Sequence, residues 1–338
     1  MSPPSVTVLV PTYNRAALLG DALQSILQQT FTDFEVVVID DGSHDATGDV
    51  LASFADSRLR ALRQTHKGIS AAMNAGLRAA RGRYIARLDS DDLWQPHLLA
   101  TLVPVLESRP DVGVVYARAD AIEDGRVVPH LQGMPPRFPE DSLRSLVYDD
   151  CTCNIALLAR RECFDDAGPY DESLLANEDW DMWLRVARQW RFVFIDQVVA
   201  RIRWHPGNLT GLQSRHLLAV LSSRRVPLDK AFAAPALPPQ VAAMRSLAYA
   251  NVHLFCGLRL WQAGQRRAAM EEFRQLLRSS DRPVVAILRI AWRVVVHPVL
   301  DRSPQGRAIS GQLARLYRYI GLPFADGATV TGGAGPGD

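Results

Sequence analysis

The chain has 338 residues, of which 48% are hydrophobic and 22% are charged, and its formal net charge is +2. This composition supports a sizeable folded core and excludes the disordered and fibrous classes. The charge is too close to neutral for a dedicated nucleic-acid-binding protein, so we expect no nucleic-acid partner.

The first 116 residues alternate short β-branched runs with segments of helical periodicity. This alternation predicts an α/β fold in which a mostly parallel sheet carries helices on both faces. The expected strands are 6–10, 35–39, 59–63, 84–88 and 112–116, and the expected helices are 16–28, 45–54, 69–80 and 98–107.

The rest of the chain divides into three parts. Residues 117–214 are mixed, with a strand and a helix start expected in 151–160, a helix over 180–190 and a strand over 191–199. Residues 215–322 follow a helical pattern that includes a hairpin over 248–273. Glycine-rich residues 323–338 are expected to be disordered.

Targeting signals are not apparent in this sequence. The N-terminus shows no basic segment followed by an apolar one, and no apolar run reaches about 18 residues. We therefore expect a cytoplasmic protein. The basic, apolar segment 284–300 is expected to form a helix that either packs against the α/β domain or makes a peripheral contact with the inner face of the membrane.

The four cysteines lie at positions 151, 153, 163 and 256 and have no metal-binding spacing. Free thiols in a reducing compartment are the simpler interpretation.

Polar clusters follow three of the expected strands, over 11–15, 40–43 and 89–92. Because the carboxyl ends of parallel strands meet at one edge of a sheet, we expect these clusters to form one site. Asp41 can accept hydrogen bonds from a nucleotide base, Tyr13 can stack on that base, and Arg15 and Lys67 can offset phosphate charge.

A divalent cation that bridges phosphates needs only one or two carboxylates, which the Asp89-x-Asp91 pair supplies. No glycine-rich phosphate-binding loop follows the first strand, so neither a P-loop nor a dinucleotide site is indicated. The sequence therefore predicts a metal-assisted site for a nucleoside diphosphate.

These segments resemble the family 2 glycosyltransferases. The similarity is carried in order by residues 6–15 (VTVLVPTYNR), 34–45 (FEVVVIDDGSHD), 67–76 (KGISAAMNAG), 82–92 (GRYIARLDSDD) and 177–185 (NEDWDMWLR). The resemblance implies a GT-A (Rossmann-like) fold over 1–214, with a donor-binding half over 5–116 and an acceptor half over 117–214. Residues 215–322 would be a C-terminal helical extension.

The resemblance also implies a nucleotide-sugar donor, Mg²⁺ or Mn²⁺, and inversion at the anomeric carbon. Asp89 would contact the ribose and Asp91 would ligate the metal. Asp92 would either join the metal site or cap the following helix. The remaining donor-site residues would be Pro11, Tyr13, Arg15, Asp41, Lys67 and Asn74.

An inverting transfer needs one base to take the proton of the acceptor hydroxyl. Asp179 is the residue that the resemblance places in this role, with Glu178 holding the acceptor or orienting the helix. The alternative is that both acids merely stabilise the start of a helix. His205 would reach the metal or the leaving diphosphate. Three tryptophans, Trp180, Trp183 and Trp204, are candidates for stacking on an acceptor sugar, although Trp183 is equally suited to the core.

The resemblance thus implies an inverting glycosyltransferase that moves a sugar from a nucleotide-diphosphate donor, with a UDP-sugar favoured, to a hydroxyl of a glycan or glycolipid. A sugar nucleotidyltransferase is one alternative, disfavoured because 11–15 contains no glycine. A catalytically inactive GT-A binding scaffold is the other, disfavoured because Asp89, Asp91 and Asp179 are all present.

Overall fold

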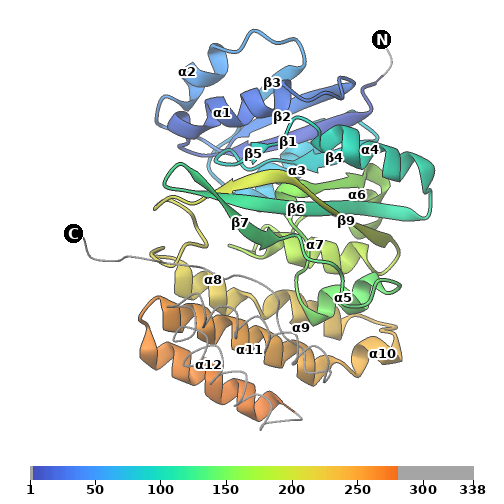
Figure 1. Ribbon diagram of the computed structural model, residues 1–338, viewed down its shortest axis with the longest axis vertical. Coiled ribbons are helices and arrows are strands. Elements are labelled where there is room, and N and C mark those ends of the chain that lie inside the picture. Colours follow the sequence, from blue (N-terminus) through green and yellow to red (C-terminus); the bar gives the residue numbers. More distant parts are fainter. Residues whose placement is uncertain (1–2, 281–338) are drawn as a thin grey trace, which may run out of the picture.

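The computed structural model describes residues 3–280, without the side chains of residues 129–131. Its first half is built on four parallel strands in the order β3 (Leu59–Arg63), β2 (Phe34–Asp40), β1 (Val6–Thr12) and β4 (Tyr84–Arg87). Every residue of β1 and β2 is buried. This agrees with their continuous apolar runs, which are typical of strands covered on both faces. The carboxyl ends of these strands form one edge of the sheet (Figure 1).

Beyond β4 the same sheet becomes mixed, so that nine strands are joined within the described residues. β6 and β9 pair in parallel, whereas the pairs β4–β8, β6–β8, β5–β9 and β6–β7 are antiparallel. The predicted α/β architecture is confirmed, but the mostly parallel sheet is found only in part: pairing is parallel in the donor half and between β6 and β9, and antiparallel elsewhere. The added strands are β8 (Leu157–Arg160), β6 (Val112–Glu123), β9 (Arg191–Arg203), β5 (Leu93–Trp94) and β7 (Arg126–Gln132).

Helices cover both faces of the sheet because alternate strand residues point in opposite directions. On one face, Val8 and Val10 pack with α1 (Ala16–Leu27) and α4 (Leu98–Ser108). On the other face, Leu9 packs in a cluster that includes residues of four further helices. These are α3 (Ile69–Ala79), α5 (Ser142–Tyr148), α6 (Arg161–Ala167) and α7 (Glu178–Val186). A short α2 (Thr47–Ala52) precedes β3, and a 3₁₀ turn, η1 (Asn154–Ala156), precedes β8.

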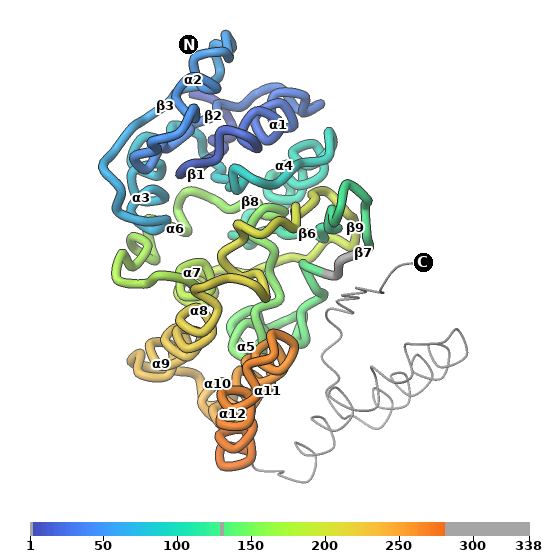
Figure 2. The backbone as a smooth tube through the Cα atoms, turned by 90° about the vertical axis from the view of Figure 1, so that its left-hand side faces the viewer, coloured from blue at the N-terminus to red at the C-terminus, as the bar shows by residue number. Residues whose placement is uncertain are grey.

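The C-terminal helices stack below the sheet and beside α5 and α7 (Figures 1 and 2). Leu217, Leu228 and Val252 belong to the same buried cluster as Leu9 and Trp180. The extension therefore continues the core of the sheet domain. Its elements are α8 (Leu217–Ser223), α9 (Val226–Ala233), α10 (Pro239–Ala242), α11 (Arg245–Gln262) and α12 (Arg266–Ser279).

Most predicted elements of the first half are confirmed to within a few residues, and so is the helical hairpin, as α11 and α12. β6 and β9 run further than predicted, α7 begins two residues earlier at Glu178, and β7 and α5 were not predicted. The segments expected over 284–300 and 323–338 lie outside the described residues. No helix among residues 3–280 combines the length and the apolar character needed to cross a membrane.

Gly82 provides a test of the packing that seats β4 beside β1. A Cβ atom added at Gly82 would stand 2.5 Å from the Thr7 nitrogen and 2.6 Å from the Val6 carbonyl carbon, both backbone atoms that cannot move aside. We expect Gly82→Ala to lower the free energy of unfolding by roughly 1–3 kcal/mol, the usual cost of overpacking. Urea unfolding measures the change. Gly48→Ala in α2 is the matched control, since nothing lies within 4 Å of its added carbon. Equal stabilities for the two variants would contradict the close approach.

Candidate active site

The first cluster at the sheet edge surrounds Asp41, which follows β2 and is buried. Its carboxylate accepts hydrogen bonds from the backbone N–H groups of Lys67 and Gly68, at 3.0 and 2.8 Å, and from the side chain of Gln64 at 2.7 Å. His66 Nδ1 lies 2.8 Å from the same carboxylate. Asp41 therefore holds the loop from β3 to α3 against the end of β2.

That loop places an aromatic pair at the rim of the site. Tyr13, just past β1, stacks on the His66 ring with centroids 4.0 Å apart and an interplanar angle of 18°. Tyr13 is 36% exposed although it stacks on His66, so part of the side chain is accessible to a planar ligand. Pro11 is buried in β1, and Lys67 is exposed beside the pair.

Asn74, by contrast, is buried in α3 and bonds to protein groups on both sides of its amide. Its oxygen accepts from the Tyr170 N–H at 2.8 Å, and its nitrogen donates to the Tyr170 carbonyl at 3.0 Å and to Glu172 at 2.9 Å. Asn74 was predicted to bind the donor, but in this structure its amide connects the loop at 170–172 to α3.

Asp91 is the second centre of the site. One of its oxygens, Oδ2, lies 3.2 Å from Arg15 Nε and 3.1 Å from His205 Nε2. Because His205 Nδ1 accepts the Gly207 N–H at 3.1 Å, the ring proton belongs on Nε2, which donates to Asp91. The structure thus brings together the two predicted metal ligands and a predicted phosphate-binding arginine.

The same residues determine which metal-binding arrangement the chain allows. Within residues 3–280 no group of three or more His, Cys, Asp or Glu residues is placed to hold an ion. Asp91 and His205 alone suit a cation whose remaining ligands are phosphate oxygens and water, as magnesium prefers. Two protein ligands are enough for a metal ion that binds together with a nucleoside diphosphate.

Asp92 does not cap a helix. The next element is β5, and α4 begins only at Leu98. The buried carboxylate instead accepts the Arg203 N–H of β9 at 2.9 Å. Since that partner comes from more than a hundred residues further along the chain, the local sequence could not show it.

Arg87 joins the Asp89 side of the site to the acidic pair. Its guanidinium contacts Asp89 Oδ1 at 2.7 Å and Glu178 Oε1 at 3.1 Å. Burial opposes the charge on Arg87, but the two carboxylates more than offset that effect and raise its pKa above the ordinary value. Arg87 lies inside the matched segment 82–92, yet the sequence analysis missed it, because a single arginine near the end of a strand carries no pattern of its own.

Glu178 and Asp179 open α7, but their surroundings differ. Glu178 is buried, and burial followed by the charge of Asp179 raises its pKa to about 7 against the opposing effect of Arg87. Asp179 Oδ1 accepts the Trp180 N–H at 2.7 Å, and its Oδ2 accepts the side-chain amide of Asn154. The predicted helix start is confirmed, and the two acids have separate partners.

Two further residues near Asp179 were not predicted. Asn154 comes from η1, and Asp150 precedes it on the same loop. Burial and the charge of Asp179 raise the pKa of Asp150 to about 7. Neither residue belongs to a matched segment, and only the fold brings them to α7.

The tryptophans of α7 do not stack on a sugar. Trp180 and Trp183 are 1% and 3% exposed, and their indole N–H groups donate to the Leu146 carbonyl at 3.0 Å and to Asn154 at 2.7 Å. The stacking interpretation is therefore wrong for both, because the apolar face of α7 turns toward the core.

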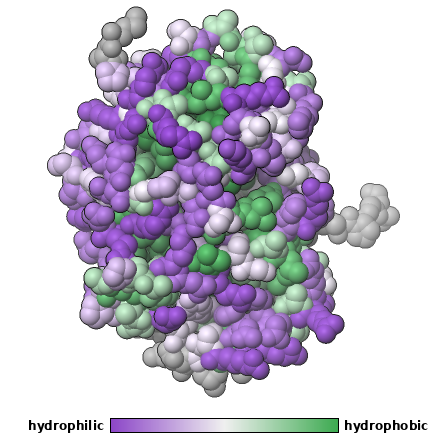
Figure 3. Space-filling view, turned by 180° about the vertical axis from the view of Figure 1, so that it is seen from behind, coloured by the Kyte–Doolittle hydropathy of each residue, from purple (hydrophilic) through white to green (hydrophobic). Residues whose placement is uncertain are grey.

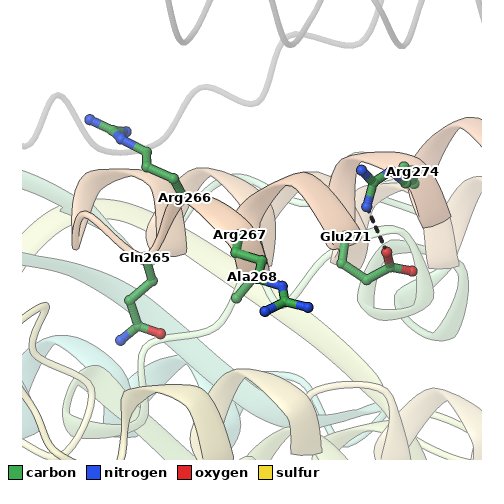
Figure 4. Close-up of a pocket in the computed structure, with 6 residues that line it drawn as sticks. All are labelled: Gln265, Arg266, Arg267, Ala268, Glu271 and Arg274. Atoms are coloured by element: carbon green, nitrogen blue, oxygen red, sulfur yellow. Dashed lines mark hydrogen bonds and ion pairs between the residues drawn. The ribbon is translucent and has the colours of Figure 1, made fainter.

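The described surface adds little to this site. The face in Figure 3 is mostly polar, with apolar side chains in scattered small groups. A shallow depression on α12 is lined by Gln265, Arg266, Arg267, Ala268, Glu271 and Arg274 (Figure 4). Figure 4 shows Glu271 paired with Arg274, at 3.1 Å, and Arg266 and Arg267 pointing to different sides of the helix. None of these residues contacts the site acids Asp41, Asp89, Asp91, Glu178 or Asp179 through a hydrogen bond or ion pair in the described part of the chain.

Solved structures with the same fold are glycosyltransferases of the GT-A type. The crystal structure of S. aureus TarS 1-349 superposes with a TM-score of 0.58 and 18% identity, covering 98% of this chain and 95% of that one. The mannosyltransferase PcManGT from Pyrobaculum calidifontis, solved with GDP-Man and Mn²⁺, gives a TM-score of 0.56 and 22% identity, covering 95% and 88%. At these identities the likeness concerns the fold.

Sequence comparison identifies the family. Residues 7–165, a little under half of the chain, match the model of glycosyl transferase family 2, and this part of the chain belongs to that family. An uncharacterised glycosyltransferase of Nostoc sp. is 32% identical over 187 residues, which are 53% of this chain and 56% of that relative. The Escherichia coli WfaP, a UDP-Glc:alpha-D-GlcNAc-diphosphoundecaprenol beta-1,3-glucosyltransferase, is 28% identical over 183 residues, 54% of this chain and 69% of that one.

The raised pKa of Glu178 predicts how stability changes with pH. Its pKa of about 7 in the fold exceeds its ordinary value of 4.5, so the folded state holds the proton more tightly. The resulting stabilisation is present below pH 4.5 and is lost as the pH rises through about 7. We expect Glu178→Gln to flatten the fall in unfolding free energy over this window, measured by urea unfolding at several pH values. Glu123→Gln, at the exposed end of β6, is the control. An unchanged slope in Glu178→Gln would show that this carboxyl is not the group responsible.

Proposed function

We propose that this protein is a metal-dependent, inverting glycosyltransferase that moves a sugar from a nucleotide-diphosphate donor to a hydroxyl of a glycan or glycolipid. The observation that carries the proposal is the bridge from Asp89 through Arg87 to Glu178. This bridge connects two parts of the site: the carboxyl edge of the sheet, which suits a nucleotide, and the acidic start of α7. The site therefore combines groups for the donor with a carboxylate, Asp179, for the acceptor.

A UDP-sugar is the favoured donor. The exposed part of Tyr13 can receive a planar base, and the loop that Asp41 holds lies beside it. TarS is known in complexes with UDP and UDP-GlcNAc, and the name of WfaP specifies a UDP-glucose donor and a lipid diphosphate acceptor. These relatives support, for this chain, a UDP-sugar donor and an acceptor used in polysaccharide or glycolipid assembly.

Asp91 would ligate Mg²⁺ or Mn²⁺. His205 would be a second ligand through Nε2 once its ring proton moves to Nδ1, which would then give up the hydrogen bond that it accepts from the Gly207 N–H. The cation supplies positive charge where the leaving diphosphate develops negative charge. Arg15, 3.2 Å from Asp91, stands where it can share that task. Asp89, held by Arg87, would face the ribose.

Asp179 is a better base than Glu178 on the geometry. Glu178 is paired with Arg87, and the raised pKa leaves its carboxyl partly protonated near neutral pH. In the transfer, the acceptor oxygen forms a bond to the anomeric carbon as its proton passes to Asp179. The bond from that carbon to the phosphate oxygen breaks, and the electron pair leaves with the diphosphate.

The metal role is tested by Asp91→Asn, which keeps the size of the side chain. We expect loss of sugar transfer and of metal-dependent donor binding with little change in melting temperature, because the amide lacks the charge that holds a cation. Transfer assays with and without EDTA, together with calorimetric titration of UDP and Mn²⁺, make the measurement. Full sugar transfer by Asp91→Asn, or sugar transfer undiminished in EDTA, would contradict the proposed metal role.

The base is tested by comparing Asp179→Asn with Glu178→Gln. A positioned general base is worth ~10²–10⁴-fold in rate, so we expect Asp179→Asn to lower kcat by that order and to leave donor KM nearly unchanged. Glu178→Gln should cost less, because its amide oxygen still accepts from Arg87. If Glu178→Gln proves the slower variant, the base has been assigned to the wrong acid. If Asp179→Asn unfolds the chain, its role is structural.

A further inference from the structure

A short series of hydrogen bonds connects the hydrophobic core to Asp179. Trp183 Nε1–H donates to Asn154 Oδ1 at 2.7 Å, and Asn154 Nδ2–H donates to Asp179 Oδ2. The other oxygen of Asp179 is held by the Trp180 N–H in the first turn of α7. Each carboxylate oxygen thus has one defined protein donor.

The indole determines which way the amide of Asn154 points. An indole N–H can only donate, so the amide oxygen of Asn154 must face Trp183. The amide nitrogen is then turned toward Asp179, where it meets an acceptor. An amide without such a partner would be able to flip and present its oxygen to the carboxylate, which would repel Asp179.

Trp183 is itself held rigidly by its neighbours. It is 3% exposed and packs edge-on against Phe164 of α6 and Phe192 of β9, with ring centroids 5.9 and 6.1 Å away. These aromatic contacts leave the Trp183 ring little room to rotate, so its N–H group points in a fixed direction. The amide of Asn154, which accepts from that N–H, is fixed with it. The carboxylate of Asp179 is in turn oriented from the core.

The charges around Asp179 make such a restraint useful. Glu178 is adjacent in sequence, and the charge of Asp179 acts on Asp150 as well. Two neighbouring acids repel Asp179, whereas Arg87 and its positive charge attract it. Without a fixed donor the carboxylate would be free to turn toward that arginine.

We propose that Asn154 and Trp183 form a positioning pair that holds the Asp179 carboxylate in one orientation for proton transfer. The inference rests on the proposed role of Asp179 as the base. Neither residue exchanges a proton: the acceptor hydroxyl loses its proton to Asp179, and the amide of Asn154 stays neutral. Both act through Asp179, so neither is a catalytic residue.

The test uses two variants of the whole chain. Asn154→Asp keeps an acceptor for the indole but replaces the amide donor with a repelling carboxylate. We expect it to lower kcat on the order of 10²-fold at unchanged donor KM, the loss typical of a misplaced reacting group. Trp183→Phe keeps a ring in the core but removes the N–H that fixes the amide, and it should lower kcat by about tenfold.

Trp180→Phe is the matched control. Trp180 is equally buried, and the variant also loses one indole hydrogen bond, to the Leu146 carbonyl, but this indole does not contact Asn154. Phenylalanine keeps the backbone N–H that bonds to Asp179, so the control leaves both hydrogen bonds of that carboxylate in place. Its melting temperature should fall as much as that of Trp183→Phe, while its kcat stays that of the unaltered protein. Equal losses of kcat in the two tryptophan variants would mean that only stability matters, and the positioning role would be wrong.

A double variant separates this inference from the proposed function. If Asn154 acts through Asp179, Asn154→Asp should cost nothing further in an Asp179→Asn background. An additional fall in kcat would overturn the positioning pair. Unimpaired kcat in Asn154→Asp, with Asp179→Asn slow, would reject the pair and leave the base in place. Full activity in Asp179→Asn would instead reject the proposed base itself.

Discussion

The ion pairs of Arg87 are the interaction on which the candidate site depends. Arg87 lies at the end of β4, and its guanidinium touches carboxylates from two parts of the chain that are about ninety residues apart. Asp89 belongs to the loop after β4, and Glu178 to the start of α7. Carboxylates this close repel one another unless a cation lies between them. Removing that cation would leave the buried Glu178 without its partner, so the sheet edge and α7 are electrostatically interdependent.

Other arginines extend the same arrangement along the sheet edge. Arg15 meets Asp91 at 3.2 Å, and Arg203 meets Asp21 at 2.8 Å while its own N–H bonds to Asp92. Each joins segments that are distant in sequence. The edge thus concentrates carboxylates, and the cost of their mutual repulsion is offset by arginines close to them.

The helical extension contributes to the position of the acidic pair. Asn177, which precedes Glu178, has φ of 61°, a left-handed conformation that asparagine tolerates better than most residues. Its side-chain amide donates to the Val220 carbonyl at 3.1 Å and to Ser223 at 2.9 Å, both in α8. The start of α7 is therefore fixed from two sides, by Arg87 at the sheet and by α8 in the extension.

The sequence by itself determined the parallel half of the sheet, the grouping of polar loops at its carboxyl edge, and the family. These follow from local features: buried strands read as continuous apolar runs, and loops after parallel strands must meet at one edge. The tertiary structure alone decided what each polar residue bonds to. One expectation for Asp92 was a helix cap, yet its carboxylate bonds to the backbone of β9, and Trp180 was a candidate for stacking on a sugar, yet it lies in the core. Arg87 and Asn154 carried no local pattern, because their partners Glu178 and Asp179 are 91 and 25 residues away. Such contacts depend on how strands from both halves of the chain pair, which periodicity along the chain does not encode.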